Sequence, residues 1–353
     1  MEDGSNVSSH ETQSVLGPSM KKALLLVNCT VLSIGSCGGP LIHRLYFIYG
    51  GKRIWLSSWL LTAGWPLILI VLIITFYYRR ANSSAKLFNL KPRLILASAV
   101  LGVFSGVDGY LFSYGVAKLP VSTTALITSL QLVFTAVFAY FLVKQKFSSF
   151  SVNAVFLLAI GSGVLALNTS TDRPEGESIR EYVLGFIVTV GGTVSYGLIM
   201  PLIELTYQKA KQVVDYQLVM EIQLVMCLFA TLFCTVGMLI NKDFEAMPRE
   251  ARNFELGETK YYVVLVCTAM MWQLFFLGVN GVILCGSSLL SGIIITVLLP
   301  VIEILAVIFY DEKFQAEKGV ALVLSLWGFL SYFYGEFKHN KKMETNHVAE
   351  MVV

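Results

Sequence analysis

Charged residues are scarce in this chain. They make up 14% of its 353 residues, whereas a soluble domain carries roughly 25%. Hydrophobic residues make up 56%, so a soluble fold would expose more apolar surface than water tolerates. The composition therefore excludes a soluble enzyme or binding domain and predicts an integral membrane protein. The formal net charge of +3 is small and gives no indication of nucleic-acid binding.

Clustered histidines and paired cysteines are also missing. The four histidines, His10, His43, His339 and His347, lie in the terminal segments or at the end of an apolar run, and the six cysteines form no CxxC pair. We expect the cysteines to be inert buried thiols, and we expect no metal and no cofactor. An integral membrane enzyme would need intramembrane histidines beside carboxylates, or a Ser/His pair. The chain has neither, so we predict that it is not an enzyme.

Long apolar runs are what the chain has in abundance. A bilayer core of about 30 Å is spanned by about 20 apolar residues in a helix. We therefore predict an all-α integral membrane protein with about ten transmembrane helices. A receptor with a seven-span bundle does not fit this number. The runs lie at approximately 22–43, 54–78, 94–117, 120–143, 150–168, 182–206, 216–240, 261–284, 287–310 and 318–337.

Two of these runs indicate an internal duplication. The segment 119–147 opens with hydroxyl-rich residues, continues apolar and ends in Lys146-Phe147, and the segment 287–314 does the same and ends in Lys313-Phe314. An offset of 167 residues superimposes the two endings. Five spans in each half is an odd number, so the second half must insert upside down relative to the first. Two inverted five-helix repeats are a transporter architecture, although a duplication without a transport role is the simpler alternative.

The repeats set the expected domain organisation. We predict a disordered cytoplasmic tail over 1–20, a first repeat over 21–168, a connecting loop over 169–181, a second repeat over 182–338 and a cytoplasmic tail over 339–353. The densest short basic loop, 79–93, lies on the same side as both tails, which fits the positive-inside rule. The plasma membrane is the default location. The loop after the seventh span contains MPREARNFE, which is suited to a short interfacial helix.

Carboxylates inside apolar runs are costly and by default mark a substrate or ion pathway. Asp108 lies centrally in the third span among glycines, and Glu303 lies in the ninth span three residues after Pro300. Glu221 lies early in the seventh span. Asp108 could instead make a structural hydrogen bond within the bundle, and Glu303 could reach the interface. Glu204 lies near the end of the sixth span, where helix capping explains it as well as function does.

Neutral polar residues form two further patterns. Thr124, Thr128, Gln131 and Thr135 make one polar stripe along the fourth span, which should face protein or water rather than lipid. Trp272 repeats at four-residue intervals with Phe276 and Asn280 in the eighth span, and Gln273 follows it. Trp272 lies too far into its span for an interfacial aromatic belt.

These side chains predict the kind of ligand. The first span adds Asn28, the third adds Tyr114 and the sixth adds Tyr196 beside glycines. A cavity with amides, a few carboxylates and flat aromatic faces suits a planar, hydrogen-bonding, weakly basic molecule. Phosphorylated ligands need cations, and the spans offer no excess of buried Lys or Arg.

Several ordered motifs resemble the plant purine permeases, a branch of the drug/metabolite transporter superfamily. They cover roughly residues 21–340. The family's third-span motif is Asp-Asn-Tyr-Leu-Tyr, where this chain has Asp108-Gly109-Tyr110-Leu111-Phe112. The matching motifs are GSCGGPLIHRLYFIYGGKRIW (35–55), LPVSTTALI (119–127), VKQKF (143–147), LIMPLIELTYQKAK (198–211), WQLFFLG (272–278) and EKFQAEKGVALVLSLWGFLSYFYGE (312–336).

The resemblance implies ten spans, cytoplasmic termini and proton-coupled uptake of adenine, cytokinins and related bases by alternating access. On this hypothesis the base edge is bound by amide or hydroxyl groups, the ring is stacked on aromatic groups, and a carboxylate carries the coupling proton. An exporter or exchanger of other heterocyclic metabolites or alkaloids is the alternative. The oligomeric state stays open. The residues in these roles are Gln131, Asn28, Gln273, Thr128 and Asp108 for the edge, Trp272, Tyr114 and Tyr196 for stacking, and Glu303, Asp108 and Glu221 for the proton.

Overall fold

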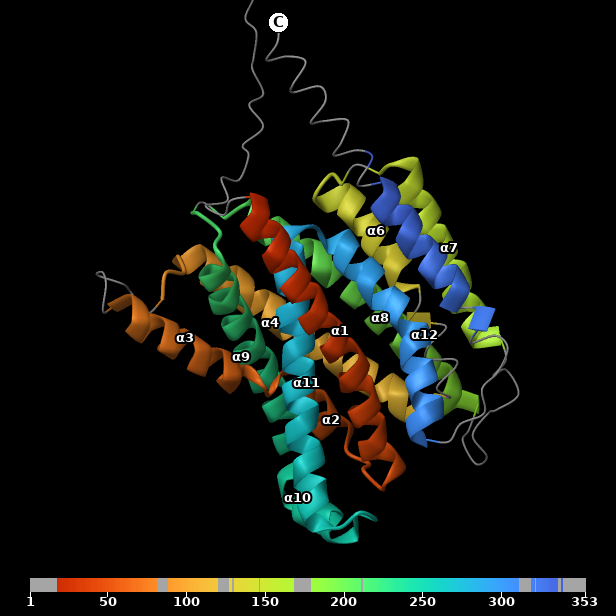
Figure 1. The fold of residues 1–353 in the computed structure, drawn as a ribbon. Helices are drawn as coiled ribbons and strands as arrows, with labels where there is room; N and C mark the ends of the chain where they lie inside the picture. The colour runs from red at the N-terminus through yellow and green to blue at the C-terminus, as the bar shows by residue number, and fades with distance from the viewer. Residues whose placement is uncertain are drawn as a thin grey trace, which may run out of the picture.

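Helices account for all the regular secondary structure in the described part of the chain, in which no strand occurs. The computed structural model describes residues 18–80, 88–119, 127–128, 130–145, 147–167, 179–210, 212–310, 319–320, 322–335 and 338. The labelled helices (Figure 1) are α1 (Pro18–Ile48), α2 (Ile54–Thr62), α3 (Trp65–Arg80), α4 (Pro92–Lys118), α6 (Gln131–Leu142), α7 (Ser149–Leu167), α8 (Ile179–Gln208), α9 (Tyr216–Ile240), α10 (Asp243–Asn253), α11 (Glu258–Cys285) and α12 (Ser288–Tyr310).

Seven helical stretches of the described residues are long and apolar enough to cross a membrane, with α2 and α3 together forming one of them, Ile54–Tyr78. This shows a multi-pass membrane protein. Three shorter apolar helices, Gln131–Leu142, Ser149–Gly161 and Leu322–Gly335, fall within the predicted fourth, fifth and tenth spans. The number of ten spans stays a prediction, because 120–126 and 311–318 lie outside the described residues. The predicted connecting loop 169–181 lies almost wholly outside them as well.

The predicted second span, 54–78, matches the candidate membrane span Ile54–Tyr78, but its helix is interrupted. α2 ends at Thr62 and α3 begins at Trp65, with a turn at Ala63 and Gly64 between them. Pro66 has no N–H to continue the helical hydrogen bonds, and its place in the first turn of α3 suits a helix start. A Cβ on Gly64 would lie 2.6 Å from the Ala269 carbonyl oxygen. Beyond this break α3 diverges from the bundle (Figure 1).

Close helix pairs form the centre of the bundle. α1 and α11 lie side by side over most of their length (Figure 1). Their backbones meet at Gly35 and Gly278, where an added Cβ would lie 2.3 Å from the Phe275 nitrogen and 2.5 Å from the Leu32 Cα. Small residues permit such approach in membrane helices. α4 of the first half packs against α8 of the second half, and it also packs against α9.

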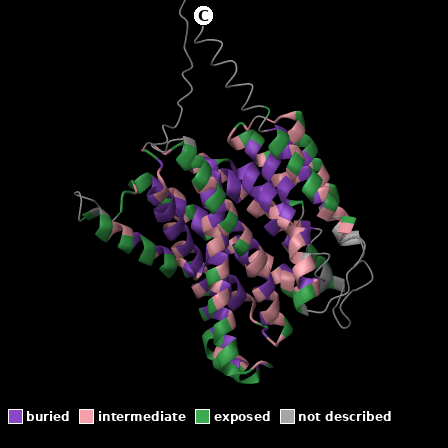
Figure 2. Cartoon of the chain, in the orientation of Figure 1, coloured by how far each residue is buried: buried purple, intermediate pink, exposed green. Residues whose placement is uncertain are grey.

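Buried and exposed side chains separate as expected for a protein surrounded by lipid. The largest buried cluster joins α1, α4, α6, α8, α9, α11 and α12. Exposed large apolar residues lie on the outer helices instead, including Ile70 and Ile74 of α3 and Trp327 of the helix 322–335. Figure 2 shows the exposed residues along α3 and the buried ones toward the centre of the bundle. In water these exposed residues would be costly, whereas a bilayer accommodates them.

The short helix predicted in the loop after the seventh span is confirmed as α10, at the end of the bundle opposite the start of α1 (Figure 1). Glu250 of α10 accepts hydrogen bonds from the hydroxyls of Tyr46 at 2.5 Å and Tyr261 at 3.1 Å. Its other oxygen lies 3.7 Å from Nε of Arg53, which also reaches Asp243 at 3.6 Å. Burial raises the pKa of Asp243 above its ordinary value, and a hydrogen bond from Asn241 offsets only part of this rise. We call this cluster the Glu250 clasp, because it ties the α1–α2 connection to α10 and α11.

Candidate functional site

A cavity of about 230 Å³ lies in the middle of the bundle. Its walls come from α1, α2, α4, α6, α8, α11 and α12. Five of the predicted site residues line this cavity, namely Asp108, Thr128, Gln131, Tyr196 and Trp272. They come from four helices and the short segment before α6, so the fold brings together residues that lie far apart in the sequence.

Asp108 is the cavity's carboxylate in the described structure. Its side chain is 9% exposed, and Oδ1 has no hydrogen-bond partner among the described residues. Gly109 beside it allows α2 to approach, since an added Cβ would lie 3.1 Å from Leu61. No Lys or Arg occurs among the described residues that line the cavity. A charged carboxylate in such a place lacks a compensating partner, so this position calls for a proton or a hydrogen-bonding ligand.

Aromatic rings make up one wall. Trp272 packs edge-to-face on Phe275 at 5.2 Å and on Phe112 at 6.0 Å. Tyr196 from α8 lies parallel to Phe275 at 6.3 Å. The indole Nε1 of Trp272 and the hydroxyl of Tyr196 have no partner among the described residues. This wall therefore offers flat faces together with free hydrogen-bond donors.

Polar groups from two other helices complete the cavity. Gln131, the first residue of α6, is 7% exposed, and Thr128 lies just before it. Ser36 of α1 is buried, with its hydroxyl also unpartnered in the described structure. The predicted polar stripe thus faces the interior over Thr128, Gln131 and the buried Thr135, while Thr124 lies outside the described residues.

Other predicted site residues lie away from the cavity. Asn28 accepts a hydrogen bond from the hydroxyl of Tyr216 at 3.1 Å, and Tyr114 lies beside Tyr110 at 6.2 Å. Gln273 is buried on the face of α11 that meets Gly64. Neither amide atom of Gln273 has a partner in the described structure.

The predicted proton-coupling residues are in different surroundings. Glu221 is fully buried and accepts hydrogen bonds from Gln217 at 2.9 Å and from the backbone N–H of Asn89 at 2.8 Å. It thereby anchors the segment before α4. Glu303 lies within α12, and its side chain is outside the described part of the structure. Asp108 is thus the member of this set that lines the cavity in the described structure.

Sequence reasoning missed His43. Its ring is 3% exposed and lies 6.2 Å from Trp272 and 6.4 Å from Phe112, edge-on to both. Its Nε2 pairs with the Ser57 hydroxyl at 2.7 Å, which joins α1 to α2 behind the aromatic wall. A lone histidine near a span end carries no sequence signal for this role.

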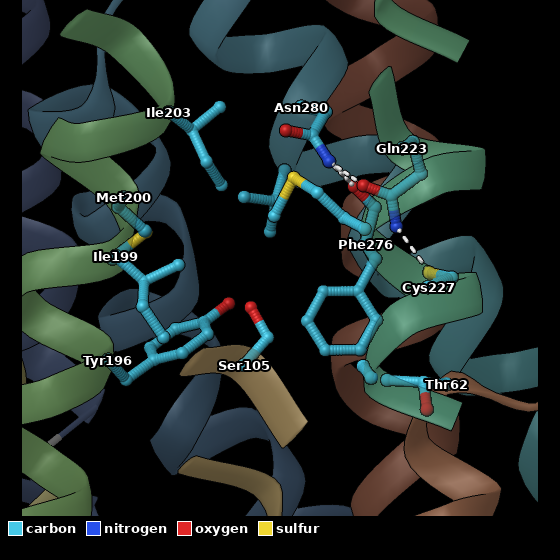
Figure 3. A pocket seen from close by; sticks show the side chains of 13 residues that line it. Thr62, Ser105, Tyr196, Ile199, Met200, Ile203, Gln223, Cys227, Phe276 and Asn280 are labelled. Carbon is cyan, nitrogen blue, oxygen red and sulfur yellow. Dashed lines mark hydrogen bonds between the residues drawn. The ribbon is translucent and has the colours of Figure 1, made fainter. Parts of the chain in front are cut away.

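A second, much smaller cavity of about 20 Å³ adjoins the first (Figure 3). Asn280 of α11 donates a hydrogen bond to Gln223 of α9 on one side of it, and Gln223 donates to Cys227 at 3.0 Å. The hydroxyl of Tyr207 on α8 donates to Asn280 at 3.0 Å. Three helices are therefore linked by one buried chain of hydrogen bonds.

Comparisons with known proteins show the family of the chain. The chain matches the family model for purine nucleobase transmembrane transport over residues 23–342. Purine permease 3 of Arabidopsis thaliana is 55% identical over 323 residues, covering 90% of this chain and 92% of the relative. Purine permease 2 of the same plant is 51% identical over 338 residues, covering 92% and 94%. One solved crystal structure, 15% identical, shares the fold with a TM-score of 0.57 over 88% of this chain and 97% of its own.

Proposed function

The chain belongs to the purine permease family and is a transporter rather than an enzyme, and from this premise we propose that it takes up purine bases such as adenine and cytokinins together with protons. The cavity of about 230 Å³ is the binding site in this proposal. The observation that carries it is the buried Asp108, whose Oδ1 has no partner among the described residues and which lines the same cavity as the aromatic wall. A purine base presents flat faces and an edge of alternating donors and acceptors, which these groups complement.

The chemistry of the lining supports a base over a phosphorylated ligand. Trp272 and Tyr196 supply faces for stacking, which contributes about 1–3 kcal/mol per base in nucleic-acid complexes. Gln131 offers a donor and an acceptor to the base edge, and Thr128 adds a hydroxyl. Phosphate and carboxylate groups are held by cations, which are absent from the described lining. Asn28, Gln273 and Tyr114 would bind substrate only in a conformation that turns them toward the cavity.

Asp108 is our first candidate for the proton carrier. A proton on its carboxyl group would remove the cost of an uncompensated charge, and would add a donor toward the base. Glu221 already accepts two hydrogen bonds, so it ranks behind Asp108. Glu303 stays a candidate because it follows Pro300 in α12. Pro300 has no N–H for the helical hydrogen bond, and this favours a bend in the helix there.

Helix packing supports alternating access between two inverted repeats. In the predicted repeats α1 corresponds to α8, α4 to α11 and α6 to α12. α1 packs on α11 as α8 packs on α4, and α6 packs on α8 as α12 packs on α1. The same pairing in both halves is what an inverted duplication produces. We place the protein in the plasma membrane with both termini in the cytoplasm.

Uptake into yeast lacking its own purine uptake tests the function. We expect saturable uptake of radiolabelled adenine that is faster at pH 5 than at pH 7 and is abolished by a protonophore. Asp108→Asn keeps the size of the side chain but cannot exchange a proton, so uptake should lose its pH dependence. Loss of label from preloaded cells instead of uptake would identify an exporter. Absence of adenine uptake by protein that reaches the cell surface would refute the proposal.

A further inference from the structure

The small cavity is an extension of the large one. Four residues line both, namely Thr62, Ser105, Tyr196 and Phe276, and they come from α2, α4, α8 and α11. Figure 3 shows Tyr196 and Ser105 with their hydroxyls turned toward each other on one side of the small cavity, and Phe276 lying opposite them. We call the small cavity the annexe and these four residues its mouth. A ring bound in the large cavity would face this mouth with one of its edges.

The walls of the annexe beyond the mouth are largely apolar. Its volume of about 20 Å³ is room for one group about the size of a water molecule. Methionine side chains are unbranched and adapt to the shape of a neighbour, so the walls can yield to a somewhat larger group. The apolar walls are Ile199, Met200 and Ile203 of α8, Met226 and Ala230 of α9, and Val279 of α11.

The polar groups at the closed end of the annexe are already paired. The Asn280 amide donates to Gln223 and accepts from Tyr207, and Gln223 donates to Cys227. A ligand group that reaches this depth therefore gains little from being polar. The hydroxyl of Tyr196 at the mouth has no partner among the described residues. From the mouth inward, a ligand would thus meet first the hydroxyl of Tyr196 and then the apolar walls of the annexe.

We propose that the annexe is a subsite for a short apolar substituent on the base, and that its walls set the length of substituent that the transporter accepts. An exocyclic nitrogen or oxygen would lie at the mouth beside Tyr196, and the alkyl group that it carries would enter between α8 and α9. This inference rests on the proposed function, because it takes the large cavity as the site of the base. It assigns selectivity to Ile203 and Cys227, which lie outside the large cavity.

Widening the annexe gives the first test. Ile203→Ala removes a buried wall side chain, and Ile222→Ala is the matched control, because Ile222 is fully buried but lines neither cavity. The probes are adenines with N6-methyl to N6-pentyl chains, competing with radiolabelled adenine for uptake. We expect Ile203→Ala to raise the affinity for the longer chains relative to adenine, by about fourfold for each methylene newly accommodated. The control should leave this ratio as it is in the parent.

Filling the annexe gives the converse test. Cys227→Leu places a larger side chain in the cavity, and Cys234→Leu makes the same change at a buried position of α9 that lines neither cavity. We expect only Cys227→Leu to lower the affinity for N6-alkyl adenines relative to adenine.

Ratios that stay constant in both annexe variants would overturn the subsite. An equal change of the maximal rate for every base would also overturn it, and would assign the annexe to the exit path. Failure of the parent to take up adenine at all would instead refute the function on which the inference rests.

Discussion

Glu204 offers a direct test of whether a carboxylate near a span end is structural. Its Oε2 accepts a hydrogen bond of 2.7 Å from the backbone N–H of Ser288, the first residue of α12, and its side chain is 8% exposed. Glu204→Ala would leave that buried N–H without its acceptor, which costs about 1–3 kcal/mol. The carboxylate also faces the positive end of the α12 dipole, an interaction worth about 0.3–1 kcal/mol. We therefore expect a total loss of about 1–4 kcal/mol.

The conservative variant separates these two contributions. Glu204→Gln keeps an oxygen acceptor at the same place and removes the charge, so it should lose about 1 kcal/mol or less. Thermal unfolding in detergent, followed by size-exclusion chromatography of a fluorescent fusion, should show a midpoint a few degrees lower for Ala and a smaller shift for Gln. Glu258→Ala is the control, because Glu258 lies in the first turn of α11 but is exposed.

Transport by these variants decides the interpretation. Glu204 does not line either cavity, so the KM for adenine should be unchanged in whatever protein reaches the surface. An unchanged midpoint in Glu204→Ala would refute the capping role. A folded Glu204→Gln protein without pH-dependent uptake would show that Glu204 takes part in proton coupling instead.

Three further predictions follow from the packing. Trp272→Ala should raise the KM for adenine about tenfold or more, because stacking is lost. Trp272→Phe keeps an aromatic ring and should keep most of the affinity. Equal effects of the two variants in uptake assays would exclude stacking. Gly278→Val should prevent α1 and α11 from packing closely, because even an added Cβ would lie 2.5 Å from the Cα of Leu32. Normal amounts of folded protein in membranes would contradict this. Glu250→Ala should lower the unfolding midpoint more than Glu255→Ala, since Glu250 holds Tyr46 and Tyr261 and Glu255 is exposed.

The sequence alone predicts the parts of the fold that follow from local pattern. Apolar run length indicates the long helices, and the segment MPREARNFE predicts α10. The polar stripe places Thr128 and Gln131 on an interior face, and the position of Trp272 far inside its span indicates that it faces protein rather than an aromatic belt. Gly64 and Pro66 are local signals for the break between α2 and α3, although the length of the apolar run alone predicts a single helix.

What the sequence could not provide depends on contacts between distant segments. Glu221 and Asp108 look alike as carboxylates in apolar runs. Only the fold shows that Glu221 holds a backbone N–H before α4 while Asp108 has an oxygen without a partner. Asn28 resembles a cavity residue until Tyr216, 188 residues away, is seen to bond it. The role of each polar side chain in the membrane is thus fixed by its partner, which no local pattern specifies.

The break at Gly64 divides one membrane span into a part that lines the cavity, α2, and a part on the outside of the bundle, α3. α2 carries Leu61 and Thr62 in the cavity wall and is held by α4, α9 and α11. α3 makes fewer contacts with the bundle and turns its exposed apolar side chains outward. A helix whose apolar stretch is longer than the bilayer is thick accommodates the difference by tilting. We expect α3 to take up such a tilt at the turn while α2 stays in place. On this expectation, a change in bilayer thickness would leave the shape of the cavity as it is.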